Sequence, residues 1–112
     1  MRVAIFGATG FVGNYLVKAL LAAGHDPSVL VRSGSEKKLN QANKCRVTSG
    51  DISSVDAIRE TLDGCDAVIY NIGLLREFPR GGITFEEAHF GGVQRVLEAA
   101  QAAGVQRFIL MS

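Results

Sequence analysis

The sequence has few of the residues that mark several classes of protein. It contains no tryptophan, two cysteines and two prolines among 112 residues, and its formal net charge is only +1. This balance of charge provides no basic surface for a nucleic acid or an anionic membrane. The apolar runs "VAIF", "AVIY" and "FILM" are far shorter than the roughly 18 residues of a membrane span. We therefore expect a globular chain without a membrane span and without a nucleic-acid partner.

The two cysteines do not form a metal-binding or disulfide pattern. Cys45 and Cys65 are 20 residues apart, with no CxxC spacing and no His-Cys ligand pattern. We interpret them as reduced, partly buried thiols and predict no metal site. Met1 is followed almost at once by strand-like sequence, which leaves no room for a signal peptide. Both features predict a cytoplasmic protein.

What the chain does have is a regular alternation of apolar patterns. Short apolar or β-branched runs predict strands over residues 2–6, 28–32, 45–49, 67–71 and 107–111. Helical periodicity follows Phe11 and two capping boxes, Ser53–Asp56 and Thr84–Glu87, and a short helix is predicted over 36–42. Strands that alternate with helices indicate right-handed βαβ units and a parallel sheet. Residues 1–112 are thus predicted to form one α/β domain.

A glycine-rich segment lies between the first strand and the first helix. In "GATGFVG", residues 7–13, glycines stand where a Rossmann fold presents a helix N-terminus to a pyrophosphate. Gly7 would allow the tight turn, Gly10 would let the phosphates approach, and Gly13 would let the helix pack closely. The whole segment is the predicted phosphate-binding loop: Gly7, Ala8, Thr9, Gly10, Phe11, Val12 and Gly13. The alternative is that the glycines serve only the turn and its packing. The Rossmann interpretation predicts five strands in the order 3-2-1-4-5, with helices on both faces.

The end of the second strand carries the choice of cofactor. NAD-specific folds place an Asp or Glu roughly 20 residues past the glycines, where it binds the ribose 2′-hydroxyl. Arg32 and Ser33 stand there instead, 19 and 20 residues beyond Gly13. An arginine pairs with a 2′-phosphate, so NADP is the predicted cofactor and NAD the alternative. Lys37 and Lys38 add to this positive field or form an exposed helix face.

The motifs together resemble the extended and atypical short-chain dehydrogenases/reductases. They are "GATGFVG", "GDI" at 50–52 and "VQRVLEAAQAAGVQRFILMS" at 93–112. Residues 71–100 look closest to the subgroup of the nucleotide-binding accessory subunit of respiratory complex I, with NmrA-like regulators also similar. The resemblance implies that adenine is contacted by Asp51 and Ile52, and that the dinucleotide is lined by Asn71, Ile72 and Gly73. A solvated helix-capping Asp51 and a simple strand-ending turn at 71–73 are the alternatives.

The catalytic pair of this family is missing from the chain. Hydride-transferring members use Tyr-x-x-x-Lys, but Tyr15 is followed four residues later by Ala19 and Tyr70 by Leu74. The resemblance implies a catalytic serine at or just after Ser112, with the tyrosine and lysine later still. We therefore predict no catalytic residue here and expect the N-terminal, cofactor-binding portion of a longer fold. Two functions stay open: an NADP-dependent reductase, dehydrogenase or epimerase-like protein, or a non-catalytic regulatory or respiratory-complex assembly subunit.

Self-association is predicted from the last strand. A sheet that ends at "RFILM" presents an apolar open edge, which is a surface that recruits another chain. The resemblance also implies dimerisation through a helix over 84–103. We expect a homo-oligomer formed through one of these two surfaces.

Overall fold

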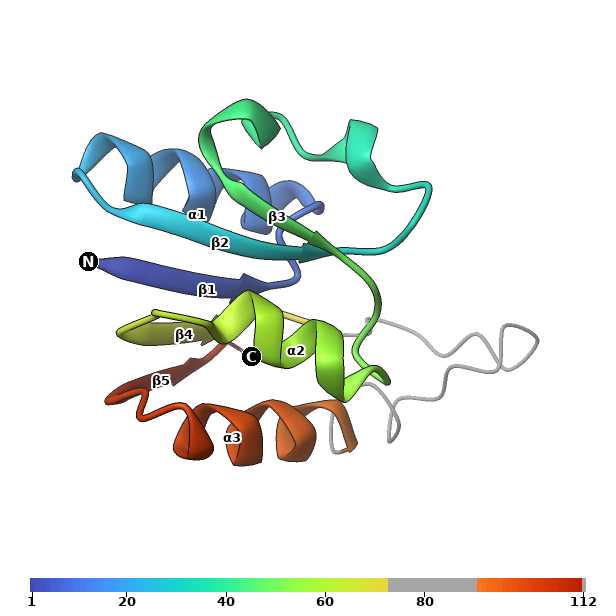
Figure 1. Ribbon diagram of the computed structural model, residues 1–112. Helices are drawn as coiled ribbons and strands as arrows, with labels where there is room; N and C mark the ends of the chain where they lie inside the picture. The colour runs from blue at the N-terminus through green and yellow to red at the C-terminus, as the bar shows by residue number, and fades with distance from the viewer. Residues whose placement is uncertain (73–90, 112) are drawn as a thin grey trace.

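The computed structural model describes residues 1–72 and 91–111, which form a parallel sheet flanked by helices (Figure 1). The strands lie in the order β3-β2-β1-β4-β5, which confirms the predicted topology. Along the chain the elements are β1 (Arg2–Phe6), α1 (Phe11–Ala22), β2 (Asp26–Val31), the 3-10 turns η1 (Glu36–Lys38) and η2 (Ala42–Lys44), β3 (Arg46–Ser49), α2 (Val55–Leu62), β4 (Ala67–Tyr70), α3 (Gly92–Ala102) and β5 (Arg107–Leu110).

The central strand β1 explains why the apolar runs show no polar alternation. Residues 3–6 pair in parallel with 27–30 of β2 on one side and with 67–70 of β4 on the other. All four residues from Val3 to Phe6 are buried, because helices cover both faces of the sheet.

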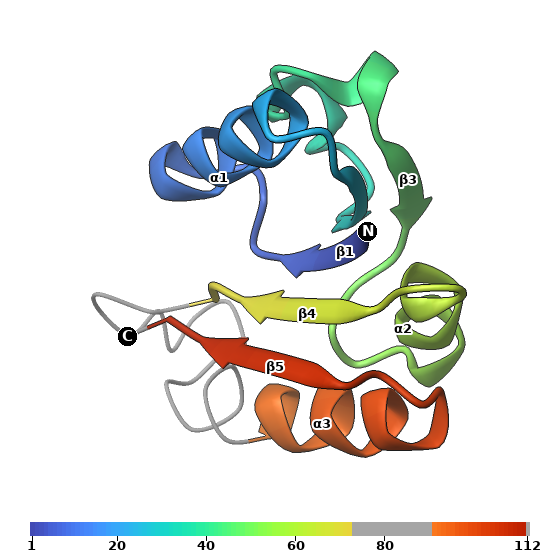
Figure 2. The ribbon, with the colours of Figure 1, turned by 90° about the vertical axis from the view of Figure 1, so that its left-hand side faces the viewer.

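Figure 2 shows α1 on one side of the sheet and α2 on the other. Two apolar clusters fill the space between the sheet and these helix layers. Successive side chains of a strand point to opposite faces, so β1 contributes to both clusters. Val3 and Ile5 pack in the cluster that contains Val17 of α1. Ala4 and Phe6 pack in the other, with residues of α2 and α3. The predicted arrangement of helices on both faces is therefore confirmed.

The structure corrects two local predictions. Residues 36–42 do not form one short α-helix but contribute to the 3-10 turns η1 and η2. The Asn14 side chain forms hydrogen bonds with Lys38 O and Asn40 N in this segment. The N-cap of α2 is Ser54 rather than Ser53, because Ser54 Oγ accepts a hydrogen bond of 3.3 Å from Ala57 N. Gly73 and the capping box at Thr84 and Glu87 lie outside the described residues.

Parallel strands bring their carboxyl ends to one edge of the sheet. The N-terminus of α1, the turn after β2 and the loop after β3 all lie at this edge, on the right of Figure 1. Ligands of open α/β sheets bind at this edge. The segments singled out from the sequence therefore meet in one region.

Candidate cofactor-binding site

Two of the three glycines in the 7–13 loop are required by the packing of the chain itself. Gly7 has a φ of +100°, and a Cβ there would lie 2.7 Å from Asn71 O. At Gly13, a Cβ would lie 2.6 Å from the backbone carbon of Ala8 and would also overlap the Gly7 carbonyl oxygen. Both positions exclude a side chain, because these neighbours are backbone atoms that cannot swing away. Gly7 makes the turn, and Gly13 lets α1 lie against that turn.

Gly10 is different, because nothing in the described chain explains why it is a glycine. It is exposed, its φ is −85°, and no atom lies within 4 Å of an added Cβ. It is also the N-cap of α1, which has no side-chain cap and no acidic residue in its first turn. The amide groups at this helix end therefore form a cradle without a side-chain cap, at the positive end of the helix dipole. Such a cradle fits the pyrophosphate of a dinucleotide.

The rest of the loop frames this helix end. Ala8 is buried and Thr9 is half-buried, whereas Phe11 and Val12 are exposed. Asn71, directly after β4, donates from Nδ2 to Gly7 O at 3.2 Å, and its backbone N donates to Phe6 O. Asn71 and Ile72 are both half-buried. The end of β4 thus lies against the glycine loop, and this contact is close because Gly7 has no side chain.

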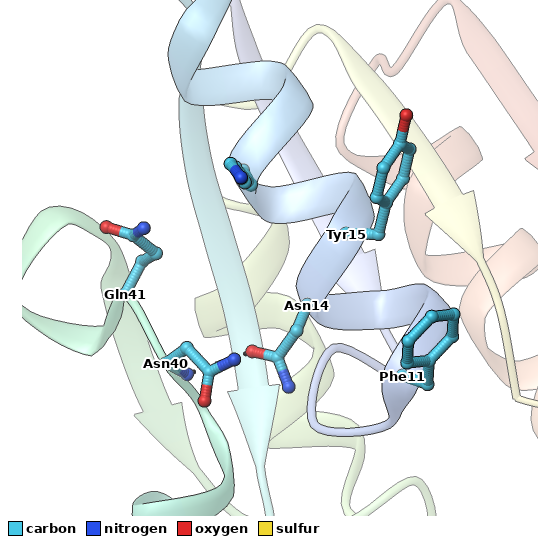
Figure 3. A pocket seen from close by; sticks show the side chains of 6 residues that line it. Phe11, Asn14, Tyr15, Asn40 and Gln41 are labelled. Atoms are coloured by element: carbon cyan, nitrogen blue, oxygen red, sulfur yellow. Dashed lines mark hydrogen bonds between the residues drawn. The ribbon is translucent and has the colours of Figure 1, made fainter.

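Asn14 connects the start of α1 to the segment that follows β2. Its Nδ2 donates to Lys38 O at 2.8 Å, and its Oδ1 accepts from Asn40 N at 2.9 Å. Figure 3 shows the Asn14 side chain pointing to Asn40, away from the exposed rings of Phe11 and Tyr15. These bonds hold the 36–40 segment beside the helix N-terminus. The sequence analysis did not identify this role of Asn14, because the partners are 24 and 26 residues away.

Arg32 and Ser33 follow the last residue of β2 and are exposed. Ser35 N donates to Arg32 O at 2.9 Å, so residues 32–35 close a turn at the sheet edge. Gly34, with a φ of +90°, occupies the left-handed conformation in that turn. Both candidate residues are therefore accessible to a ligand at this edge.

Asp51 and Ile52 follow β3 on the neighbouring connection. The Asp51 carboxylate accepts from the Ser53 hydroxyl and from Ser53 N, the latter at 2.7 Å. These two bonds, the hydroxyl first, lower the pKa of Asp51; burial opposes them, and the positive charges of Arg32 and Arg95 lower the pKa by smaller amounts. Asp51 is exposed and Ile52 is half-buried, so an ionised acceptor and an apolar side chain lie next to each other.

Helix α3 supplies contacts that the sequence analysis missed. Arg95 Nε donates to Ile52 O at 2.9 Å, which ties the loop after β3 to a helix 43 residues further along the chain. A Cβ at Gly92 would overlap the Tyr70 hydroxyl and lie 3.0 Å from Ile52 Cγ1. Burial raises the pKa of Tyr70 to about 12, and Arg95 partly offsets that effect. In the sequence, the glycine pair at 91–92 was the feature that could have indicated close packing of α3 against Tyr70 and Ile52.

The described part of the chain has no candidate metal site and no helix that could span a membrane. Among residues 1–72 and 91–111, no group of three or more His, Cys, Asp or Glu side chains could hold a metal ion. None of the helices described is long and apolar enough to cross a membrane. Cys45 and Cys65 are free thiols, and burial raises the pKa of each.

Comparison with known proteins identifies the family. Residues 7–112 match the family model described as NAD(P)H-binding. Ceramide reductase of Caulobacter vibrioides is 37% identical over 110 residues, which cover 98% of this chain and 34% of that protein. The mitochondrial NADH-ubiquinone oxidoreductase 40 kDa subunit of Neurospora crassa is 30% identical over 112 residues, which cover 96% of this chain and 29% of that protein.

Solved structures share the fold. The structure of MoeE5 in complex with UDP-glucuronic acid and NAD superposes with a TM-score of 0.79 at 24% sequence identity, covering 98% of this chain and 36% of that one. The chain spans about a third of the length of the relatives that it matches. Because the family model matches residues 7–112, the chain belongs to the NAD(P)H-binding family, and its parallel sheet with the strand order 3-2-1-4-5 is a Rossmann fold.

Proposed function

We propose that this chain binds NADP(H) in preference to NAD(H), as the cofactor-binding portion of a longer NAD(P)-dependent reductase, dehydrogenase or epimerase-like protein. In this proposal residues 1–112 form one domain, and the cofactor lies across the carboxyl edge of the sheet. The proposed binding residues are those of the glycine loop, Gly7–Gly13, together with Arg32, Ser33, Asp51, Ile52, Asn71, Ile72 and Gly73.

The observation that carries the preference for NADP is the position of Arg32. Its side chain is exposed where β2 ends, and its charge contributes to the lowered pKa of Asp51 on the neighbouring connection. A guanidinium at this edge attracts a 2′-phosphate and has no acceptor for a 2′-hydroxyl. A charge-assisted hydrogen bond of roughly 1.5–3 kcal/mol corresponds to a preference of about 10- to 100-fold.

Calorimetric titration with NADP+ and with NAD+ tests the proposal. Arg32→Asp should reverse the preference, because it replaces attraction of the phosphate by repulsion and adds an acceptor for the hydroxyl. Arg59→Asp, an equal change of charge on the exposed side of α2, is the matched control and should leave the preference unchanged. Equal NADP+ affinity in the wild type and in Arg32→Asp would refute the role of Arg32.

Binding at the glycine loop is tested separately. Gly10→Val should abolish binding of both nucleotides while the domain stays folded, because no described atom lies within 4 Å of a Cβ at this position and the larger side chain would block the approach of the phosphates. A folded Gly10→Val variant with unchanged affinity would remove the site from this loop.

A second candidate function is a non-catalytic nucleotide-binding subunit. It is supported by the similarity to the 40 kDa subunit of Neurospora crassa. The two candidates differ in turnover, because a bound cofactor without a placed proton donor loses roughly 10²–10⁴ in rate. Under both candidates the purified 112-residue chain should bind nucleotide and not oxidise NADPH with any carbonyl substrate, and the presence or absence of Tyr-x-x-x-Lys in the C-terminal part of the longer protein would distinguish them. Measurable oxidation would place the proton donor within these residues.

We also propose self-association, through β5 or α3. In β5, Ile109 and Leu110 are 48% and 49% exposed, and within the described residues β5 pairs with β4 alone. Leu97 on α3 is 39% exposed. Burial of such apolar groups favours a second copy. Light scattering should detect a dimer or a larger species. If β5 is the interface, Ile109→Lys should weaken the self-association, and a monomeric wild type would exclude it.

A cytoplasmic location is the last part of the proposal. It is supported by the two free thiols, because unpaired cysteines persist in reducing compartments. Cell fractionation should find the protein with cytoplasmic markers, and recovery from an oxidising compartment would contradict it.

A further inference from the structure

The turn that follows β2 contains a negative charge as well as a positive one. The Glu36 carboxylate accepts a hydrogen bond of 2.9 Å from Gly34 N, the amide in the middle of the turn that Arg32 opens. Glu36 is the only acidic residue between Arg32 and Cys45, whereas Lys37, Lys38 and Lys44 are basic. The negatively charged Glu36 carboxylate therefore lies against the turn at which the 2′-position of the cofactor is expected.

This contact matters because Gly34 N is itself a suitable donor for a phosphate. A free backbone amide in a turn beside an arginine is a common element of anion sites. Here a carboxylate already occupies that amide. A 2′-phosphate drawn to Arg32 must then either displace the carboxylate or remain close to its negative charge. A 2′-hydroxyl has no such conflict, since it donates a hydrogen bond to a carboxylate.

We propose that Glu36 is a further specificity-determining residue, whose carboxylate competes with the 2′-phosphate and lowers the preference for NADP that Arg32 confers. This inference rests on the cofactor binding proposed above. Glu36 lies 23 residues past Gly13, beyond the end of β2, and only the turn at 32–35 returns its carboxylate toward the sheet edge. The site then combines an attracting and a repelling group, and it retains a usable affinity for NAD.

Glu36→Gln isolates the charge. The amide oxygen of glutamine still accepts from Gly34 N, so the turn is preserved while the negative charge is removed. We expect the NADP+ affinity to rise about tenfold, with the NAD+ affinity changed less than about threefold. Because the effect is electrostatic at an exposed site, the gain should shrink as ionic strength rises. Glu60→Gln, the same charge change on α2, is the matched control and should leave both affinities unchanged.

Calorimetry on the four proteins, wild type, Glu36→Gln, Glu60→Gln and Arg32→Asp, separates this inference from the proposed function. Unchanged NADP+ affinity in Glu36→Gln, or an equal gain in Glu60→Gln, would overturn the role of Glu36. If Arg32→Asp reverses the preference while Glu36→Gln has no effect, the proposed function stands and the inference fails. If the wild type binds neither nucleotide, the proposed function fails and the inference fails with it.

Discussion

Gly10 and Gly13 lie three residues apart at the start of α1, and one added methyl group should affect them in opposite ways. Gly10→Ala places its Cβ in open space at a φ of −85°, which any residue adopts. Gly13→Ala places its Cβ 2.6 Å from the backbone of Ala8. The two substitutions are chemically identical, so a difference between them reports only the surroundings.

The size of each effect follows from these contacts. An ordinary carbon contact is roughly 3.5 Å, so α1 must move away from Ala8 by about 1 Å in Gly13→Ala. Such overpacking costs about 1–3 kcal/mol of folding free energy. The upper end of this range is expected here, because backbone atoms cannot rotate aside as a side chain can. Alanine regains about 1 kcal/mol of helix propensity, which leaves a net loss of about 2 kcal/mol. Gly10→Ala should change the free energy of unfolding by less than about 1 kcal/mol, as an N-cap substitution.

Urea denaturation and calorimetry with NADP+ measure the two consequences separately. Gly13→Ala should unfold at lower urea, whereas Gly10→Ala should keep the wild-type transition and bind NADP+ at least about tenfold more weakly. Wild-type stability of Gly13→Ala would refute the packing argument. Wild-type affinity of a folded Gly10→Ala would show that no phosphate approaches this amide.

Three further predictions concern the neighbouring connection and the core. Arg95→Gln removes the bond to Ile52 O and should weaken AMP binding several-fold without affecting nicotinamide mononucleotide, as measured by NMR titration. Ser53→Ala should raise the pKa of Asp51 toward its ordinary value in an NMR pH titration, because the hydroxyl is the largest cause of the lowered pKa. Because the pKa of Asp51 is lower in the folded chain, its carboxylate stabilises the fold above a pH of about 4, and this stabilisation is lost as the pH falls through the folded pKa. On acidification, Ser53→Ala should therefore lose less stability than the wild type. Absorbance of the Tyr70 phenolate, assigned with Tyr70→Phe, should appear only near pH 12, and ionisation near pH 10 would contradict its burial.

The amino-acid pattern alone determined the order of strands and helices and the topology of the sheet. Runs such as residues 3–6 are apolar without alternation because both faces of the sheet are covered, and this information is local. Right-handed crossovers then leave few arrangements, and the glycine loop after the first strand selected the Rossmann order 3-2-1-4-5 among them. The glycine loop was also recognisable, because its position between a strand and a helix is a matter of spacing.

Tertiary structure alone decided what each residue of the site contacts. The approach of Asn71 to Gly7, 64 residues apart, and that of Ala8 to Gly13 distinguish glycines required for packing from Gly10, which the described chain leaves open. The carboxylate of Glu36 and the guanidinium of Arg95 reach Gly34 and Ile52 because turns and helix packing bring them there. Periodicity reports which face of an element is buried, but long-range contacts depend on how the connections close in space. For that physical reason the sequence predicted a dinucleotide-binding loop and the role of Arg32, whereas the contact that led to the proposal for Glu36 was found only in the folded chain.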